Sequence, residues 1–208
     1  MNNEIKKADK VNNYLTIAGR IVCTPEFYKE YNGQKYYSTK VENCRYSHKK
    51  NIIPVVIPEK LLDLDVIKKD QLVEIKGEFN SVNVYDKDGK RHTESYIFSK
   101  RIERSEFFSR RNEIFLRGKV ISNARIGETL SGRKIADFWI IVTRWDGRTD
   151  LIRCVAWNGA AEYAAKFKPG RKVELCGRLR SNEYIKQYED YCEKRTLYEV
   201  SIIYLTEK

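Results

Sequence analysis

Aromatic and basic side chains alternate in the second half of this sequence, within segments that have the period of β-strands. Successive side chains of a strand point to opposite faces, so placing the apolar positions inside leaves rings and cations on one open face. That face carries Trp139, Arg153, Trp157, Arg178 and Arg180, with Tyr184 in the following loop. Rings stack on unpaired bases, and arginine both stacks and contacts phosphate. The pattern therefore indicates a surface for single-stranded nucleic acid.

The composition agrees with a polyanionic partner and limits the other classes of function. The 208 residues include 40 Lys and Arg against 29 Asp and Glu, a formal net charge of +11, together with 14 Tyr, 8 Phe and 3 Trp. A basic balance with many rings is typical of nucleic-acid-binding proteins. Five scattered cysteines without a C-x-x-C pair and two histidines predict no metal site, no cofactor and a reducing cytoplasm. The polar N-terminus and the absence of a long apolar run predict no signal peptide and no membrane span.

The sequence contains an internal repeat. Four landmarks recur in the same order at an offset of 99 or 100 residues. They are the segments 13–22 and 112–121, Gly33 and Gly132, Arg45 and Arg144, and the segments 73–81 and 173–181. Such a recurrence predicts two copies of one module. We place the first domain at 1–104 and the second at 105–208.

Each copy has the pattern of five strands and one helix. In the second copy, alternation predicts strands at 114–122, 135–145, 150–157, 171–181 and 196–205. An alanine-rich helix follows the third of these, and PEKLLDLDVIKKD occupies the same slot in the first copy. This is the layout of the OB-fold, a small Greek-key barrel that binds oligonucleotides or oligosaccharides. The predicted fold class is all-β, with one short helix per module and two tandem OB-fold barrels.

Several motifs of the second copy resemble those of the bacterial single-stranded DNA-binding proteins (SSB). They are Asn-x-x-x-Leu-x-Gly at 112–118, Phe-x-Ile-x-Val at 138–142, Val-Ala-Trp-x-x-x-Ala-Glu at 155–162 and Gly-x-Leu-x-Ser at 177–181. The first copy resembles the family more loosely, through NNYLTIAGRIV and VEIKGEFNS. The resemblance implies a non-enzymatic protein that binds single-stranded DNA in replication, recombination and repair, at the nucleoid. Some relatives carry two OB domains and dimerise, which implies a homodimer of four barrels.

The resemblance also implies roles for single residues, each of which has a structural alternative. Trp157 and Tyr184 match aromatic residues that contact DNA in the family, and Trp145 falls near a third, although the loop differs by one residue. Trp157 could instead close one end of the barrel or fill a subunit interface. Arg153 matches a basic contact residue, but an exposed arginine is often only solvated. Trp139 is either an added stacking platform or a dimer contact.

The first copy differs at the positions that carry these side chains. In NIIPVVIPEK, prolines replace the arginine and the tryptophan of the third strand, which predicts an edge strand or a bend. All three tryptophans lie in the second copy, where Arg144 joins the predicted contact set. We therefore predict that the second module is the principal stacking site. The first would supply an electrostatic track through Lys40, Arg45 and Tyr46, or the subunit interface.

Three other functions stay open on the sequence alone. One is a primosome-like or RNA-binding OB module, because no pattern reports on a preference for the 2′-hydroxyl of RNA. Another is a structural module of a replication or conjugation complex, with its rings buried in protein contacts. The third is an OB-type nuclease, although no P-loop or nucleophile motif predicts catalysis. Because the chain ends at SIIYLTEK without an acidic run, we expect no acidic tail for recruiting replication or repair enzymes.

Overall fold

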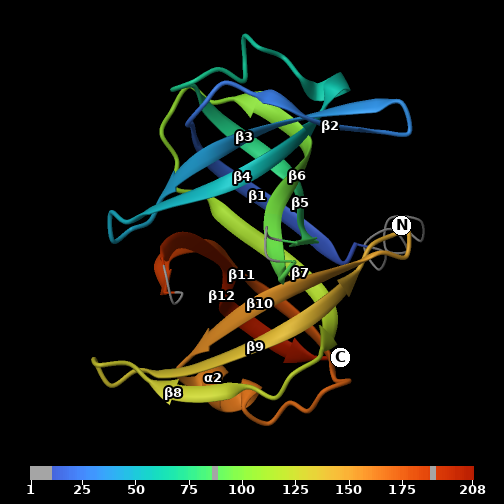
Figure 1. The fold of residues 1–208 in the computed structure, drawn as a ribbon. Coiled ribbons are helices and arrows are strands. Elements are labelled where there is room, and N and C mark those ends of the chain that lie inside the picture. The colour runs from blue at the N-terminus through green and yellow to red at the C-terminus, as the bar shows by residue number, and fades with distance from the viewer. Residues whose placement is uncertain (1–10, 86–88, 188–190) are drawn as a thin grey trace, which may run out of the picture.

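The computed structural model describes residues 11–85, 89–187 and 191–208, and most of this chain is β-strand (Figure 1). The first half contains β1 (Asn13–Ile21), β2 (Glu26–Tyr31), β3 (Gln34–Cys44), β4 (Lys50–Pro58), the 3-10 helix η1 (Glu59–Leu61), β5 (Leu72–Tyr85) and β6 (Arg91–Arg104). The second half contains β7 (Asn112–Val120), β8 (Arg125–Glu128), β9 (Lys134–Thr143), β10 (Thr149–Trp157), α2 (Gly159–Ala164), β11 (Lys172–Gln187) and β12 (Cys192–Glu207).

Each half closes into a five-stranded barrel. In the first half, pairing runs through β1, β3, β4, β6 and β5 and returns to β1. In the second half it runs through β7, β9, β10, β12 and β11 and returns to β7. The pairs β4–β6 and β10–β12 are parallel, whereas the other pairs are antiparallel. The predicted all-β fold with two OB-type barrels is therefore confirmed.

Three details differ from the sequence prediction. Each half has a sixth strand, β2 or β8, which forms a hairpin with the second barrel strand outside the closed barrel. An α-helix follows the third barrel strand only in the second half, because the first half has η1 there instead. Strand β4 is not an edge strand, since it pairs with β3 along its length and with β6 at Val55 and Val56. The two prolines of β4, which cannot donate a backbone hydrogen bond, are tolerated because the parallel pairing of β4 with β6 covers only two residues.

The first strands of the two barrels join the halves into one sheet. Strand β1 pairs antiparallel with β7, from Asn13 opposite Leu116 to Ile17 opposite Asn112. The two asparagines occupy equivalent places in the repeat and make equivalent bonds. Asn13 bonds the backbone N–H and C=O of Phe79 at 2.9 and 2.8 Å, and Asn112 bonds those of Leu179 at 2.8 and 2.9 Å. The repeated asparagine therefore fixes the first strand of each barrel to the fourth.

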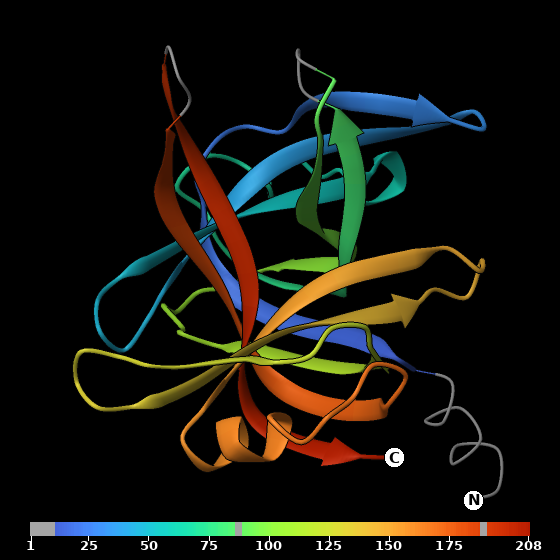
Figure 2. The same cartoon turned by 60° about the horizontal axis from the view of Figure 1, so that its bottom comes forward.

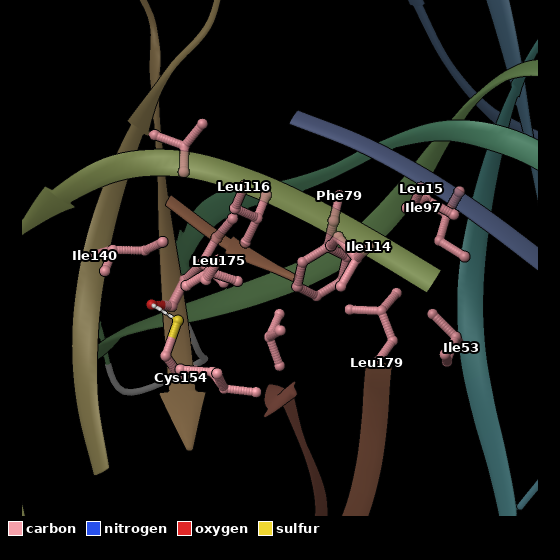
Figure 3. Packing of buried hydrophobic residues seen from close by; sticks show 14 of the residues in the cluster. Leu15, Ile53, Phe79, Ile97, Ile114, Leu116, Ile140, Cys154, Leu175 and Leu179 are labelled. Carbon is pink, nitrogen blue, oxygen red and sulfur yellow. Dashed lines mark hydrogen bonds between the residues drawn. The ribbon is translucent and has the colours of Figure 1, made fainter. Parts of the chain in front are cut away.

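One apolar core runs through both barrels (Figure 3). Leu15 and Phe79 of the first half and Ile114 and Leu179 of the second belong to the same cluster of buried side chains. Alternation predicts the interior positions of β9 and β10 correctly, whereas Val155, which alternates with this apolar set, is buried as well. The side chains that alternate with this set form the outer face of β9 and β10.

Candidate nucleic-acid interface

A groove of about 490 Å³ crosses the open face of the second barrel and extends to the first half. Strands β10, β11 and β12 form its floor, and the turns before β9 and after β3 border it. The residues that carry its rings and cations are Arg45, Tyr46, Arg133, Trp157, Arg178 and Arg180. We call it the second-half groove.

Trp157 faces this groove from the last position of β10. Its indole N–H donates to the Ser201 hydroxyl at 3.1 Å, and the guanidinium of Arg133 lies 5.3 Å from the ring centroid. The ring is only half-buried, so it forms part of an open surface rather than a plug at the end of the barrel. Arg133 is a groove residue that strand alternation does not reveal, because it follows Gly132 in the turn before β9.

Arg178 and Arg180 project from β11 on the face opposite the buried Leu179. Burial lowers the pKa of the Arg180 guanidinium, and the charges of Arg45 and Arg178 lower it further. Within the described parts of the chain, no carboxylate lies at ion-pair distance from Arg178 or Arg180. Two clustered guanidinium groups without a carboxylate partner provide positive charge for a phosphate.

Tyr46 comes from the first half and lies over the same groove. It is 72% exposed on the turn between β3 and β4. The guanidinium of Arg178 lies 5.5 Å from its ring centroid, and that of Arg110 lies 5.7 Å away. Arg110 belongs to the segment between the two halves and also contacts the ring of Phe108 at 5.4 Å. The connecting segment thus borders the groove, which the repeat pattern does not reveal.

Arg153 is held in an ion-pair network at the centre of the outer face. Its Nε donates to Asp137 at 2.9 Å, and its Nη1 donates to Glu199 at 3.1 Å. Asn182 donates to the second oxygen of Glu199 at 3.0 Å. Burial raises the pKa of Glu199, and Arg153 opposes that shift. The arginine charge is therefore neutralised locally, and Trp139 lies opposite Arg153 in the register of β9 and β10, outside the second-half groove.

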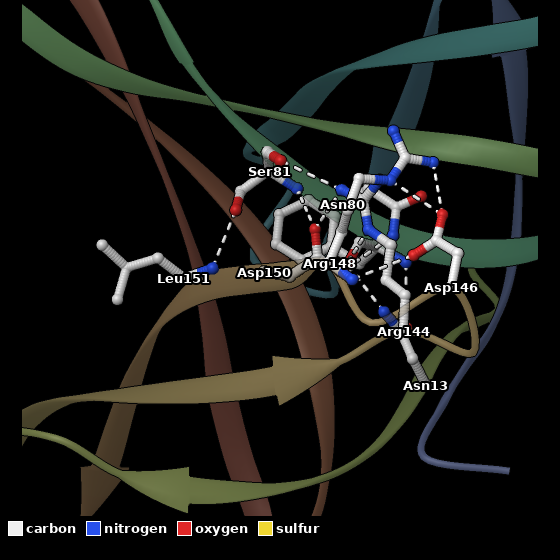
Figure 4. Close-up of polar contacts among 9 residues, drawn as sticks. Asn13, Asn80, Ser81, Arg144, Asp146, Arg148, Asp150 and Leu151 are labelled. Atoms are coloured by element: carbon white, nitrogen blue, oxygen red, sulfur yellow. Dashed lines mark hydrogen bonds and ion pairs between the residues drawn. The ribbon is translucent and has the colours of Figure 1, made fainter.

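Arg45 and Arg144 connect the two halves, and Arg45 also lines the second-half groove. Arg144 donates from Nε to Asp150 at 2.9 Å and from Nη2 to the carbonyl of Ser81 at 3.0 Å (Figure 4). Arg45 makes the equivalent bonds, to Asn51 at 2.8 Å and to the carbonyl of Ser181 at 2.7 Å. Both guanidinium groups thus hold the turns in place, and the role of the two arginines as contact residues stays a prediction.

Three further predicted residues lie at different places. Trp145 is 89% exposed and lines a groove with first-half residues, not the second-half groove. Tyr184 lies on β11 itself, opposite Arg195, in the extension of the strand beyond Arg180. Lys40 is exposed on β3 and is absent from the lining of either groove.

Other kinds of site find no support among the described residues. In these parts of the chain, no group of three or more His, Cys, Asp or Glu side chains is arranged to hold a metal ion. No helix there is long and apolar enough to span a membrane. The fold and the groove together define an OB-fold protein with a basic and aromatic ligand face.

Comparisons with known proteins agree with this class. The model of the single-strand binding protein family matches residues 111–204. A deletion variant of the single-stranded DNA binding protein from Thermus aquaticus has a similar structure, with a TM-score of 0.72, 19% identity and coverage of 94% of each chain. The wild-type protein gives 0.71 and 18%, with 94% of this chain and 92% of that chain covered. A search of curated proteins finds no match. The family match thus lies within the second half of the chain, and the structural likeness, which covers both halves, shows the fold.

Proposed function

We propose that this protein binds single-stranded DNA with little sequence preference and protects or organises it in replication, recombination or repair, at the nucleoid in the cytoplasm. The second-half groove carries the proposal, because it joins two stacking surfaces, Trp157 and Tyr46, to arginines without carboxylate partners. The family match of residues 111–204 supports it. So does the likeness to a protein that is named for binding single-stranded DNA.

The mechanism is binding and involves no chemical step. Bases stack on Trp157 and Tyr46, while Arg133, Arg178 and Arg180 neutralise the backbone. Every base has a flat face, so stacking is tolerant of sequence. Arginine also stacks on rings, and its fork of donors matches a phosphate. The groove therefore selects unpaired, flexible strands over duplexes, whose bases are already stacked on each other.

A salt-dependent titration with oligo-dT tests the proposal. For each phosphate of a single strand that the protein neutralises, the logarithm of the association constant falls by about 0.7 per unit of the logarithm of the salt concentration. The three groove arginines therefore predict a slope of about −2 or steeper. Trp157→Ala is expected to weaken binding about five-fold or more, because one stacked base contributes about 1–3 kcal/mol. Oligo-U competition separates DNA from RNA binding. An affinity that neither salt nor Trp157→Ala changes would contradict the proposal.

We further propose that residues 1–104 and 105–208 are the two domains. In support, the strands of the first barrel end at Arg104 and those of the second begin at Asn112. The intervening segment has no strand or helix among its residues. The shared sheet then represents contact between two domains of one chain.

We also propose a homodimer, which would contain four barrels. Its support is a row of neighbouring side chains across the outer face of the shared sheet, formed by Tyr14, Phe115, Cys176 and Tyr204. Tyr204 is 60% exposed. In a two-fold dimer the same row of a second copy would cover it. Tyr204→Lys is expected to shift the mass measured by light scattering to that of a monomer, whereas a wild-type monomer would refute the dimer.

A further inference from the structure

The segment between the two barrels exposes two aromatic rings beside an arginine. Phe107 and Phe108 are 78% and 54% exposed, so neither ring contributes much to the core. The sequence of residues 104–111 is RSEFFSRR, with three arginines and one glutamate. The lining of the second-half groove includes neither ring. Neighbouring rings that stay exposed in a basic segment indicate a surface for binding.

The segment is fixed to the first barrel at both of its ends. The backbone N–H of Ser105 donates to the carbonyl of Leu72 in β5 at 2.9 Å. The carbonyl of Arg111 accepts from the backbone N–H of Ala18 in β1 at 2.9 Å and from the side-chain amide of Asn43 at 3.1 Å. A ring on a segment that is already held in place loses less freedom when a ligand binds.

Phe108 and Arg110 continue the line of rings and cations of the second-half groove. The guanidinium of Arg110 lies 5.4 Å from the ring centroid of Phe108 and 5.7 Å from that of Tyr46. Tyr46 lines the groove, and the guanidinium of Arg178 lies 5.5 Å from its ring centroid. Figures 1 and 2 show the connecting segment and the turn between β3 and β4 on the same side of the molecule. We call Phe108 and Arg110 the linker platform.

The charge of Arg110 is available to a ligand. Within the described residues, no carboxylate lies at ion-pair distance from its guanidinium. The neighbouring Arg111 differs, because it donates to Glu113 at 3.0 Å and to Glu74 at 3.2 Å. Arg110 can therefore contact a phosphate without first giving up a carboxylate partner.

The linker platform suits a nucleotide of a single strand better than a protein partner. A stacked nucleotide needs one exposed ring and a nearby cation, and both are present. A stable protein partner would cover about 800 Å² on this side, with an apolar centre. The side chains that flank the two rings in the sequence are instead polar or charged, namely Glu106, Ser109, Arg110 and Arg111.

We propose that the segment between the barrels is part of the DNA-binding surface, where a nucleotide beyond the second-half groove stacks on Phe108 and Arg110 contacts its phosphate. This inference rests on the proposed function and extends it. The strand leaves the second-half groove past Tyr46 and continues along the junction of the two barrels. The connecting segment is then a ligand-binding element as well as a covalent link between the halves.

Binding of oligo-dT to the full chain tests the stacking on Phe108. The strand lengths run from about 4 to 16 nucleotides, the range of site sizes for one OB-fold. Phe108→Ala is expected to weaken binding of the longer strands about five-fold or more, whereas Phe108→Tyr retains most of the affinity because a ring is kept. The shortest strands occupy the second-half groove alone, so they should bind Phe108→Ala as tightly as the wild type.

Arg110→Ala and Arg111→Ala form a matched pair, since each removes one positive charge and the two positions are adjacent. Arg110→Ala should lower the slope of the salt dependence of oligo-dT binding by about 0.7, the contribution of one neutralised phosphate. Arg111→Ala should leave that slope unchanged, because two carboxylates already balance its charge. Equal changes of slope in the two variants would show an effect of net charge alone and refute the phosphate contact.

The remaining outcomes separate this inference from the proposed function. An unchanged Kd for Phe108→Ala at every length, beside a weakened Trp157→Ala, would overturn the linker platform and leave the proposed function standing. Equal weakening of the shortest and the longest strands would contradict its place beyond the groove. A lower mass of Phe108→Ala in light scattering would assign the ring to a contact between copies instead.

Absence of oligo-dT binding by the wild type would defeat both the proposed function and the linker platform. Circular dichroism and thermal unfolding of each variant check that the fold is retained. We expect no loss of structure, because the side chains of Phe108, Arg110 and Arg111 are all exposed.

Discussion

Arginines of the second half that look alike in the sequence have different environments in the structure. Arg153 is paired with two carboxylates, Arg144 is bonded to a buried aspartate, and Arg178 contacts a tyrosine ring without a carboxylate partner. A paired arginine must give up its partners before it can bind phosphate, which offsets most of the gain. Availability for a ligand therefore depends on neighbouring carboxylates, and among these three residues only Arg178 meets that condition.

Arg178→Ala is expected to change DNA binding, whereas Arg153→Ala is expected to change the stability of the fold. Removing Arg178 should lower the slope of the salt dependence of oligo-dT binding by about 0.7 and change unfolding stability little. Removing Arg153 should leave that slope unchanged and lower the free energy of unfolding by about 1–3 kcal/mol, since Asp137 and the buried Glu199 lose their partner. Titration at several salt concentrations and urea unfolding of both variants measure the two quantities. Equal salt slopes in both variants would contradict this assignment.

At the scale of the elements, the barrels depend on glycines where strands cross closely. A Cβ placed on Gly177 would lie 2.5 Å from the carbonyl oxygen of Ser201, and one on Gly77 would lie 2.2 Å from that of Phe98. Both glycines sit at register shifts in the pairing of the last two strands of their barrels. Their recurrence in the repeat therefore reflects close backbone approach, which no other residue permits without a shift.

Gly177→Ala is expected to lower the free energy of unfolding by about 1–3 kcal/mol, because the backbone must move to admit the methyl group. Gly159→Ala is the matched control, since a Cβ there meets nothing within 4 Å and the position begins α2. That control should be neutral or stabilising by about 0.4–1 kcal/mol. Urea unfolding followed by circular dichroism measures both. If Gly177→Ala were as stable as Gly159→Ala, the close crossing would not constrain the barrel.

The local periods of the sequence predict the strands of the two barrels, though not β2 and β8, and much of the second-half groove. Alternation is enough to place Trp157, Arg178 and Arg180 on one face, because a two-residue period depends only on neighbours in the chain. Trp145 and Tyr46 each line a groove together with residues of the other half because β1 pairs with β7. No local pattern encodes that pairing. Long-range contacts therefore explain why the composition of each groove could not be derived from its own module.

At the scale of the molecule, the two halves are joined by two related contacts with different chemistry. Asp150 is fully buried beside Arg144, whereas its counterpart beside Arg45 is the neutral Asn51. Asp150→Ala is expected to lower the free energy of unfolding by about 3–5 kcal/mol, since it leaves a guanidinium without its partner. Asp150→Asn should cost clearly less, because the first half uses the same arrangement. Urea unfolding of both variants tests this, and equal losses would refute the structural equivalence of the two contacts.

Because one core and one sheet span both halves, the chain is expected to unfold in a single transition. The tryptophans allow a direct test, since a Trp145→Phe background keeps only Trp139 and Trp157, both within the second barrel. In that background, Ile57→Ala creates a cavity at a fully buried position of β4, in the first barrel. It should cost about 2–5 kcal/mol and lower the urea midpoint of tryptophan fluorescence as much as that of circular dichroism. A fluorescence midpoint that stays in place while the circular dichroism splits into two transitions would show that the barrels unfold independently.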